Sequence, residues 1–309
     1  MSLEKVVVAV DFSPESDVAV QQALALARQH GAGLTLLHVG MLPDRPVGVP
    51  ESMQPTLDHY MQIVEDHLQS DRQRLAELRT RISGQGAEIS HMVCDGHPAG
   101  AIARAAEELK ADLVVTGTHG RTGLRRFRLG SVAERVVRTA GCNVLVSRAR
   151  DADAHGFRRV LVATDFSASA DDALDTAVAL VAPGTDIDVL YCWYLEPISY
   201  PYYAPTTAAL EVTTSIRTTL VESSEEQGRR LLERYRDAPV KLSFHLLEAA
   251  PAQGIQQWLE SRDYDLVVTG SRGRRGVTRW LLGSVAEMTV RHAPCSVLVV
   301  HDMPGSAPA

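Results

Sequence analysis

A glycine-rich stretch in the first half of the chain has residue types and a spacing suited to phosphate binding. Two glycines three residues apart are followed, after nine further residues, by a Gly-Ser pair: Gly117, Gly120, Gly130 and Ser131. Glycine lets the backbone approach a ligand closely and adopt positive φ angles where needed. We therefore expect a phosphate site here, and we expect bulky substitutions of Gly117 or Gly120 to weaken it while leaving the fold intact.

Arginines lie between these glycines: Arg121, Arg125, Arg126 and Arg128. Their fork-like guanidinium groups suit phosphate oxygens. Any one of them, taken singly, is more typical of a solvated loop than of a ligand contact. As a group beside the glycines, they favour an anionic ligand.

The second half of the chain repeats this spacing. Its matching residues are Gly270, Gly273, Gly283 and Ser284, with Arg274, Arg275 and Arg279 between the glycines. A single Gly-x-x-Gly is usually a turn. Two copies with the same spacing favour binding over a turn alone.

The two serines of the motif are expected to open helices. A helix N-terminus presents free N–H groups and the positive end of the helix dipole, so an anion is stabilised there. A structural alternative stays open, because Ser131 with Glu134 and Ser284 with Glu287 also fit the S-x-x-E capping box. Capping and phosphate binding can coexist, since the free N–H groups outnumber one side chain.

Further candidates lie where apolar runs end. The first run of each half is followed by an aspartate and the second run is closed by an apolar residue: Asp11 and Asp165, Val39 and Cys192. In open α/β sheets, ligands bind outside the carboxyl ends of the strands, where the strand order reverses. The aspartates could instead cap the next helix, although Ser13 and Ser167 are better placed for that role.

The elements that must position these residues follow from the apolar pattern. Short β-branched runs predict strands buried on both faces at 6–10, 34–39, 89–93, 113–115 and 144–146. Helical spacing predicts helices at roughly 18–28, 57–81, 99–109 and 132–138. Gly31 suits the C-cap of the first of these helices. Strands that alternate with helices in this way indicate a doubly wound α/β fold.

The chain is a duplication. When it is shifted by about 153 residues, residues 112–117 fall on 265–270 and residues 129–134 on 282–287. A period this long indicates a repeated domain, since solenoid units have about 20–50 residues. We expect one domain at 1–149, a linker at 150–156 and a second domain at 157–303. The long loops 42–55 and 196–207 receive no role from the sequence.

Composition excludes several classes of protein. The 309 residues carry a net charge of −7, which argues against a nucleic-acid partner. The four cysteines are scattered, so neither a disulfide framework nor a structural zinc site is expected. Cys142 and Cys295 are interpreted as small buried hydrophobes.

No apolar run is long enough for a membrane span and no secretion signal opens the chain, so we expect a cytoplasmic protein with no membrane partner.

Familiar catalytic signatures are missing from the sequence. It contains no P-loop, no G-x-G-x-x-G after the first strand and no G-x-S-x-G elbow. The spacing of His38, His97 and His119 matches neither a metal site nor an acid–base pair, so they are interpreted as surface or satisfied histidines. A binding protein is therefore favoured over a dedicated enzyme, with no catalytic residue and no protein metal ligand assigned.

With Asp11 and Asp165 at strand ends and G-x2-G-x9-G-S in both halves, the chain resembles the ATP-binding branch of the universal stress protein family. The resemblance covers essentially the whole chain as a tandem pair. It implies two doubly wound domains, each a five-stranded parallel sheet flanked by helices in an adenine nucleotide alpha hydrolase-like, Rossmann-like sandwich. It also implies ATP across the strand ends, accompanied by Mg²⁺ or Mn²⁺.

The resemblance assigns roles by position. Adenine would be lined by Val10, Asp11 and Val39, ribose and phosphate approached by Gly117, Gly120 and Arg121, and the triphosphate held by Gly130, Ser131 and Val132. The matching residues of the second half are Asp165, Cys192, Gly270, Gly273, Arg274, Gly283, Ser284 and Val285. One departure favours the first site: Trp193 stands where the first half has Gly40.

The leading hypothesis is a tandem, ATP-binding, nucleotide-dependent regulator of the stress response. Two alternatives stay open: a slow ATPase or self-phosphorylating protein, and an interaction scaffold in which only the first site is active. The resemblance further suggests that the last strands, 143–147 and 296–301, pair across a pseudo-twofold axis as an intramolecular pseudo-dimer. A further homodimer and unidentified protein partners are left open.

Overall fold

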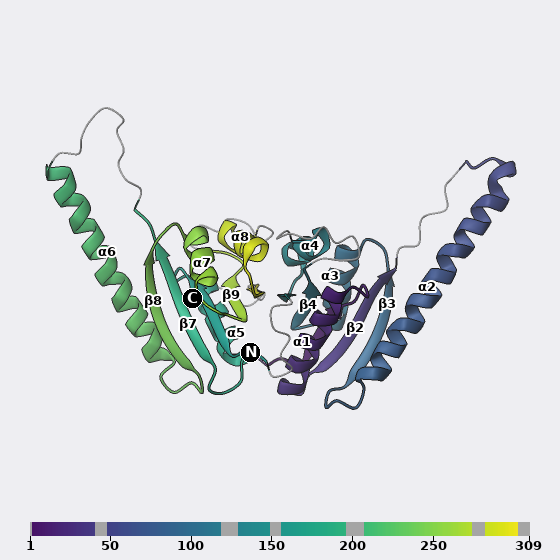
Figure 1. The fold of residues 1–309 in the computed structure, drawn as a ribbon, viewed down its shortest axis with the longest axis horizontal. Coiled ribbons are helices and arrows are strands. Elements are labelled where there is room, and N and C mark those ends of the chain that lie inside the picture. The colour runs from purple at the N-terminus through teal and green to yellow at the C-terminus, as the bar shows by residue number, and fades with distance from the viewer. Residues whose placement is uncertain are drawn as a thin grey trace. The chain divides into compact units, whose positions relative to one another are not determined.

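The structure is a computed structural model that describes residues 2–40, 48–118, 129–148, 156–195, 207–273 and 282–301 (Figure 1). The chain divides into two compact units between Gly156 and Phe157. Residues 150–155 of the expected linker lie outside the described residues, as do the arginines named above as candidates: Arg121, Arg125, Arg126, Arg128, Arg274, Arg275 and Arg279. The two units are described separately below.

Parallel strands form the sheet of the N-terminal unit. Its described strands are β1 (Lys5–Ala9), β2 (Gly33–Gly40), β3 (Ile89–Asp95), β4 (Leu113–Gly117) and β5 (Asn143–Ser147). Their order is β3-β2-β1-β4-β5, and Val8 of β1 pairs with both Leu36 of β2 and Val115 of β4. The order therefore reverses between β1 and β4, which is where an open sheet of this kind binds ligands.

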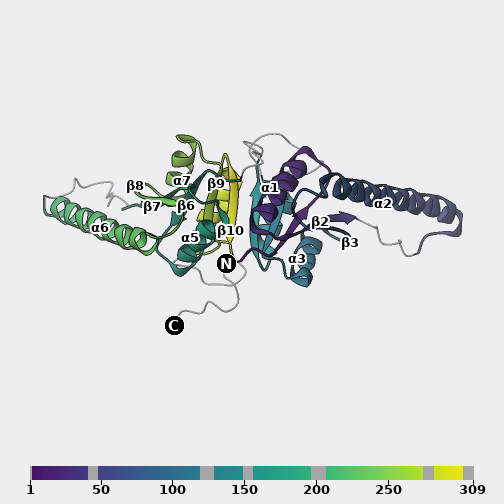
Figure 2. The same cartoon turned by 90° about the horizontal axis from the view of Figure 1, so that it is seen from below.

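Helices cover both faces of this sheet. They are α1 (Pro14–His30), α2 (Gln54–Ile82), α3 (Pro98–Leu109) and α4 (Ser131–Thr139), and a short 3-10 helix, η1 (Glu51–Met53), precedes α2. Figure 2 shows α1 and α3 on opposite faces of the sheet. Helix α1 packs on β1 and β4, α2 packs on β2 and β3, and α3 packs on α4. The carboxyl ends of β1, β2 and β4 thus lie between α2 on one side and α3 and α4 on the other.

The C-terminal unit repeats this topology. Its strands are β6 (Arg159–Thr164), β7 (Asp186–Trp193), β8 (Lys241–Glu248), β9 (Leu266–Gly270) and β10 (Ser296–Val300), and its helices are α5 (Ala168–Leu180), α6 (Thr207–Arg234), α7 (Pro251–Glu260) and α8 (Ser284–His292). The strand order is β10-β9-β6-β7-β8 with parallel pairing. The predicted fold class of tandem doubly wound units is confirmed.

The first helix of each unit begins and ends as the sequence predicts. Ser13 is the N-cap of α1, and its hydroxyl accepts a hydrogen bond from the N–H of Ser16 at 3.2 Å. Ser167 caps α5 in the same way. Gly31 ends α1 with a φ of 65°, a left-handed conformation that glycine adopts without steric cost. The two N-caps therefore fix where each helix begins. The turn just before it carries Asp11 in the first unit and Asp165 in the second.

The strands supply the core of each unit. Val8, Val115 and Leu145 are completely buried, and burial of such a side chain contributes about 1.5–3 kcal/mol.

All four cysteines are free thiols, and burial raises the pKa of Cys142 to about 12, so its thiol stays neutral. Among the described residues, no helix combines the length and the hydrophobicity of a membrane span.

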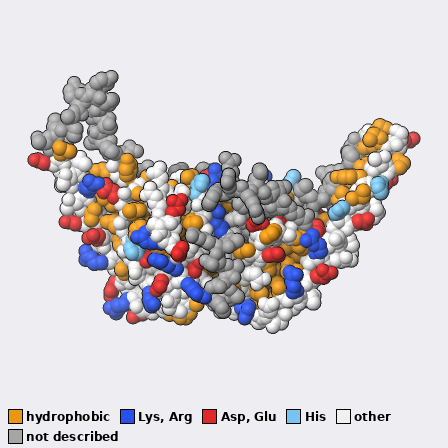
Figure 3. Space-filling view, in the orientation of Figure 1, with side chains coloured by type: hydrophobic (Ala, Val, Ile, Leu, Met, Phe, Trp, Pro, Cys, Tyr) orange, Lys and Arg blue, Asp and Glu red, His pale blue; other side chains and the backbone are white. Residues whose placement is uncertain are grey.

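Helices α2 and α6 are much longer than the strands they cover. With 29 residues, α2 extends about 43 Å and continues past the strand ends in Figure 1. Apolar side chains are exposed at the N-terminal end of α2, including Met53 of η1 and Tyr60 and Ile63 of α2. Figure 3 shows hydrophobic surface over this end of the helix. The opposite part of α2 buries Leu75, Leu78 and Ile82 against the sheet.

Candidate functional site

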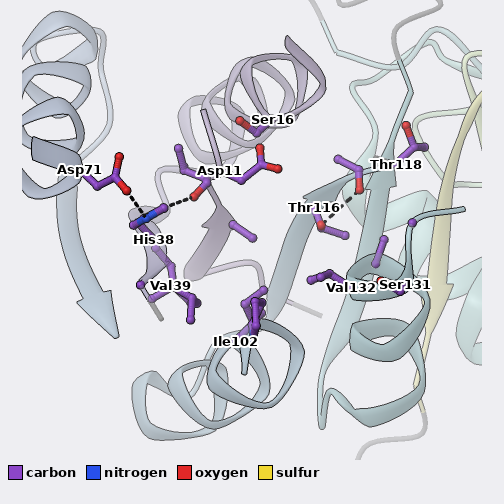
Figure 4. A pocket seen from close by; sticks show the side chains of 18 of the residues that line it. Asp11, Ser16, His38, Val39, Asp71, Ile102, Thr116, Thr118, Ser131 and Val132 are labelled. Carbon is purple, nitrogen blue, oxygen red and sulfur yellow. Dashed lines mark hydrogen bonds and ion pairs between the residues drawn. The ribbon is translucent and has the colours of Figure 1, made fainter. Parts of the chain in front are cut away.

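A cavity of about 500 Å³ opens at the carboxyl ends of the strands in the N-terminal unit (Figure 4). Its wall is formed by residues at the ends of β1, β2 and β4 and by residues of α2, α3 and α4. It lies at the reversal of strand order between β1 and β4. The cavity therefore occupies the position where doubly wound sheets bind their ligands.

The structure brings together all the predicted first-half residues that it describes. Those that line the cavity are Val10, Asp11, Val39, Gly117, Gly130, Ser131 and Val132. Gly120 and Arg121 lie outside the described residues. Residues far apart in the sequence thus share one wall because each follows the end of a strand or opens a helix at the same edge.

Asp11 organises the turn between β1 and α1. Its Oδ1 accepts hydrogen bonds from the backbone N–H of Ser13 at 3.0 Å and from the Ser13 hydroxyl at 2.5 Å. Asp165 likewise accepts the N–H of Ser167 at 3.0 Å. The aspartates therefore support the capping serines and are not themselves the N-caps of the helices.

Phe12 and Phe166, which follow these aspartates, have unusual backbone conformations. Their φ angles are 62° and 58°, in the left-handed region that bulky residues rarely adopt. The Phe12 ring packs on His38 at a centroid distance of 4.9 Å, and the Arg74 guanidinium lies 4.1 Å from the ring centroid. Strained backbone of this kind persists only where surrounding contacts hold it.

Helix α4 points an uncapped N-terminus at the cavity. Its N-cap is Gly130, which has no side chain to satisfy the first-turn N–H groups, and Ser131 is the first helical residue. The capping-box alternative is therefore wrong, because it requires Ser131 at the N-cap. Helix α8 has the same arrangement, with Gly283 at the N-cap and Ser284 inside the helix. Such an N-terminus favours an anion.

Gly117 lies close to the backbone of another element as well as to the cavity. A Cβ added at Gly117 would lie 3.0 Å from the backbone carbon and oxygen of Glu15 in the first turn of α1. At Gly270, it would lie 2.5 Å from the Ser169 hydroxyl oxygen and 2.7 Å from the Ser169 carbonyl oxygen. A bulky residue at Gly117 would therefore press on the first turn of α1, so we expect it to lower the stability of the fold, and that the fold stays intact remains a prediction.

Sequence reasoning missed the polar pair that forms the α2 side of the cavity. The Nδ1 of His38 lies 2.7 Å from the carbonyl oxygen of Val10, and its Nε2 lies 3.4 Å from Oδ2 of Asp71. His38 is buried, both residues line the cavity, and Figure 4 shows the His38 ring next to Asp71. One signal could have found the pair: Asp71 falls at helical spacing from Leu68 and Leu75, within the apolar face of its helix.

The remaining lining residues extend the site beyond the prediction. They include Ser16, His67, Ile102, Thr116, Thr118 and Ala133. The described wall contains aspartates and histidines but no lysine or arginine. Within this wall, the groups suited to an anion are thus the backbone N–H groups of α4, and Val39, Ile102 and Val132 supply an apolar surface.

The second-half residues are arranged at the equivalent strand ends. A Cβ added at Gly273 would lie 2.8 Å from Oδ2 of Asp165, so these predicted residues are neighbours. Gly283, Ser284 and Val285 form the start of α8, whereas Arg274 lies outside the described residues. Cys192 faces α7, where a Cβ added at Gly254 would lie 2.9 Å from its Sγ. Burial raises the pKa of the Cys192 thiol to about 12.

The two units differ most where β2 and β7 end. At Gly40, an added Cβ would overlap Cδ2 of Leu68 on α2. The C-terminal unit has Trp193 at the matching position, 6% exposed, with the Arg217 guanidinium of α6 5.8 Å from its ring. An indole therefore lies against α6 at the position where the N-terminal unit has only glycine beside its cavity.

Comparisons with known proteins identify the family and agree with the fold. The model of the universal stress protein family matches residues 2–148 and 156–301. A universal stress protein of Mycolicibacterium smegmatis is 30% identical over 307 residues, covering 96% of both chains. One from Mycobacterium tuberculosis is 29% identical over 298 residues, covering 95% of this chain and 96% of its own. The crystal structure of a universal stress protein from Archaeoglobus fulgidus has a TM-score of 0.67 at 22% identity and covers 97% of each chain.

Proposed function

Because this chain belongs to the universal stress protein family, we propose that the cavity of its N-terminal unit binds ATP and that the bound nucleotide regulates a stress-response function. The observation that supports this proposal most is the convergence of predicted residues on one cavity that also receives the uncapped N-terminus of α4. A volume of about 500 Å³ is within the usual range of small-molecule sites.

The chemistry of the wall suggests how the nucleotide would lie. The apolar side chains of Val10 and Val39, beside the Asp11 carboxylate, suit a base that carries polar edges. Gly130, Ser131 and Val132 place the N–H groups of α4 where phosphates would be stabilised. Mg²⁺ or Mn²⁺ would accompany the triphosphate, since Mg²⁺ in nucleotide sites is usually held through phosphate oxygens and water.

Calorimetry with Mg-ATP and with adenosine tests the proposal. Ser131→Glu places a carboxylate in the first turn of α4, where it suits the helix dipole but repels phosphate. We expect this variant to stay folded, to lose at least about tenfold in ATP affinity, and to keep its affinity for adenosine. No binding of ATP by the natural chain, together with no nucleotide in its acid extract, would contradict the proposal.

A second candidate, a scaffold in which only the N-terminal unit binds nucleotide, is favoured by Trp193. Ser284→Glu is the matched variant in the C-terminal unit, because Ser284 also follows a glycine N-cap. If only the first site is active, the natural chain binds one ATP and Ser284→Glu changes nothing. Two ATP per chain, with one lost in Ser284→Glu, would show that both units bind.

Other expectations from the sequence stay predictions. Hydrolysis or self-phosphorylation would be detected by release or transfer of labelled γ-phosphate above the level in Ser131→Glu. Pairing of the two halves, a homodimer, protein partners and a cytoplasmic location all await measurement.

A further inference from the structure

The imidazole of His38 lies between oxygen atoms on both sides. Its Nδ1 is 2.7 Å from the Val10 carbonyl oxygen, which can only accept a hydrogen bond, so Nδ1 carries a hydrogen. Its Nε2 is 3.4 Å from a carboxylate oxygen of Asp71. A neutral imidazole with hydrogen on Nδ1 would direct the lone pair of Nε2 at that carboxylate. Only the imidazolium offers a donor to both oxygens.

Asp71 occupies an unusual place for a charged residue. It lies between Leu68 and Leu75 on the buried face of α2, and its side chain is only 16% exposed. A carboxylate removed from water in this way is costly unless it is paired. Arg74 provides one partner, with Nη1 3.4 Å from Oδ1 of Asp71, and His38 faces the other oxygen. The position thus suits a charged partner on the His38 side.

These contacts connect α2 to the strand-end turn. Arg74, which pairs with Asp71, also lies over the ring of Phe12, and that ring packs against His38. Phe12 directly follows Asp11 in the chain. Val10 directly precedes Asp11, and its carbonyl oxygen is hydrogen-bonded to His38. The cavity residues Val10 and Asp11 are therefore held from the α2 side through His38 and Phe12.

We propose that His38, as an imidazolium paired with Asp71, is a positioning residue of the nucleotide cavity and makes affinity for the base increase as the pH falls. This inference rests on the proposed function. When His38 loses its proton, its lone pair faces Asp71 and the contact that joins α2 to the end of β1 weakens. The part of the cavity that would hold the base is then less well ordered. Ligand binding must supply the free energy that orders it, so the affinity falls.

Other charged groups lie near this pair. Those that line the cavity or lie beside the pair are Asp11 after β1 and His67 and Arg74 on α2. At the end of β3, Oδ1 of Asp95 lies 3.9 Å from where a Cβ added at Gly40 would be. Helix α1 contributes the uncharged Ser16 to the wall. Arg74 keeps its charge throughout the pH range in which histidines titrate, and it contacts the opposite oxygen of Asp71. His67 hydrogen-bonds through Nδ1 to the carbonyl of Ile63 on its own helix.

The C-terminal unit provides an internal comparison. At the position of His38, β7 has Tyr191, whose ring packs on Phe166 at 4.8 Å, so the aromatic contact is kept. At the position of Asp71, α6 has Ser224, whose hydroxyl donates to the carbonyl of Leu220. The C-terminal unit thus packs this turn without a His–Asp pair, which leaves the pair in the N-terminal unit available for a role beyond packing.

Adenosine affinity measured against pH tests the inference. Adenosine has no group that titrates between about pH 5.5 and 8.5, so a change in its affinity reports on the protein. For the natural chain we expect at least about fivefold weaker binding at pH 8.5 than at pH 5.5. His38→Asn keeps a donor for the Val10 carbonyl but carries no charge, and Asp71→Asn removes the partner charge. Both variants should show a flat profile.

His245→Asn is the matched control. His245 also pairs with an aspartate, with Nε2 2.8 Å from Oδ1 of Asp188, but it belongs to the C-terminal unit and does not line the cavity. It should keep the pH profile of the natural chain. Nitrogen NMR shifts of the His38 ring, recorded in protein without ligand over the same pH range, should change together with the adenosine affinity.

The possible failures are distinguishable. If neither adenosine nor ATP binds at any pH, the proposed function is overturned and this inference with it. If adenosine binds with an affinity that does not change with pH, or if His38→Asn keeps the natural profile, only the inference is overturned. Thermal unfolding of each variant identifies loss of the fold, and Asp71→Asn gives an independent result if His38→Asn is unstable.

Discussion

Phe12 and Phe166 show how each unit maintains a strained residue beside its strand-end aspartate. A left-handed conformation costs a non-glycine residue about 1–2 kcal/mol, and it recurs at the same place in both units. Ring contacts to His38 and to Tyr191 offset this cost. The consequence is local: the backbone turns sharply enough for the aspartate to support the capping serine of the next helix.

At Gly117, the demands of packing can be separated from those of ligand binding. We expect Gly117→Val to lower the free energy of unfolding by about 1–3 kcal/mol, because the new side chain meets the backbone of Glu15. Gly141→Val is the control, since a Cβ there meets nothing within 4 Å. Urea denaturation measures both. If Gly117→Val were as stable as the natural chain and still lost ATP affinity, the glycine would serve the ligand alone.

At the scale of elements, the N-termini of α1 and α4 differ in what satisfies them. Helix α1 begins with the side chain of Ser13, whereas α4 begins with Gly130 and no side-chain cap. The serine near the start of α1 caps its helix, whereas the serine near the start of α4 lies inside its helix. One N-terminus is satisfied within the protein, and the other directs its N–H groups at the cavity.

Alanine substitutions distinguish these helix starts. We expect Ser13→Ala to cost about 1 kcal/mol of stability, the usual effect of losing an N-cap. Ser131→Ala should change stability by less than about 0.5 kcal/mol, because Ser131 makes no capping bond. Chemical denaturation of the two variants provides the comparison. Equal destabilisation would mean that Ser131 is a structural residue after all.

The strands and most of the cavity could be predicted because they depend on local pattern. Continuous apolar runs identify buried parallel strands, and the described first-half candidates placed at strand ends meet at one edge of their sheet. Ser131 opens α4 as predicted, whereas the capping-box alternative places the N-cap one residue too late, since Gly-Ser-x-x-Glu fits a capping box at the serine while the backbone begins the helix after the glycine. The contact between His38 and Asp71 depends on how α2 is rotated about its axis, which short-range spacing does not determine.

At the scale of the whole molecule, duplication has kept the fold and changed the residues around the strand ends. Both units have the same strand order, the same positive-φ phenylalanine and the same glycine N-cap. The N-terminal unit has Gly40 beside its cavity, whereas the C-terminal unit has the buried Trp193. A change of this kind alters the binding surface without affecting the sheet.

This divergence predicts where ATP will slow amide hydrogen exchange along the chain. We expect protection in short segments near residues 9–11, 37–40, 116–118 and 130–133, because these line one cavity although they are far apart in sequence. The matching segments near 163–165, 190–193, 269–271 and 283–286 should exchange at the same rate with and without ATP. Hydrogen-exchange mass spectrometry compares both sets in one experiment.

Ser131→Glu is the control for that experiment, since it should abolish the protection without changing exchange elsewhere. Protection that appears in both sets, and that Ser131→Glu removes only from the first, would show that Trp193 leaves a working second site. Protection confined to segments outside both sets would place the nucleotide somewhere other than the strand ends. At an ATP concentration a hundred times the dissociation constant, a bound site gains about 2.7 kcal/mol, which is enough to slow exchange through local opening by about a hundredfold.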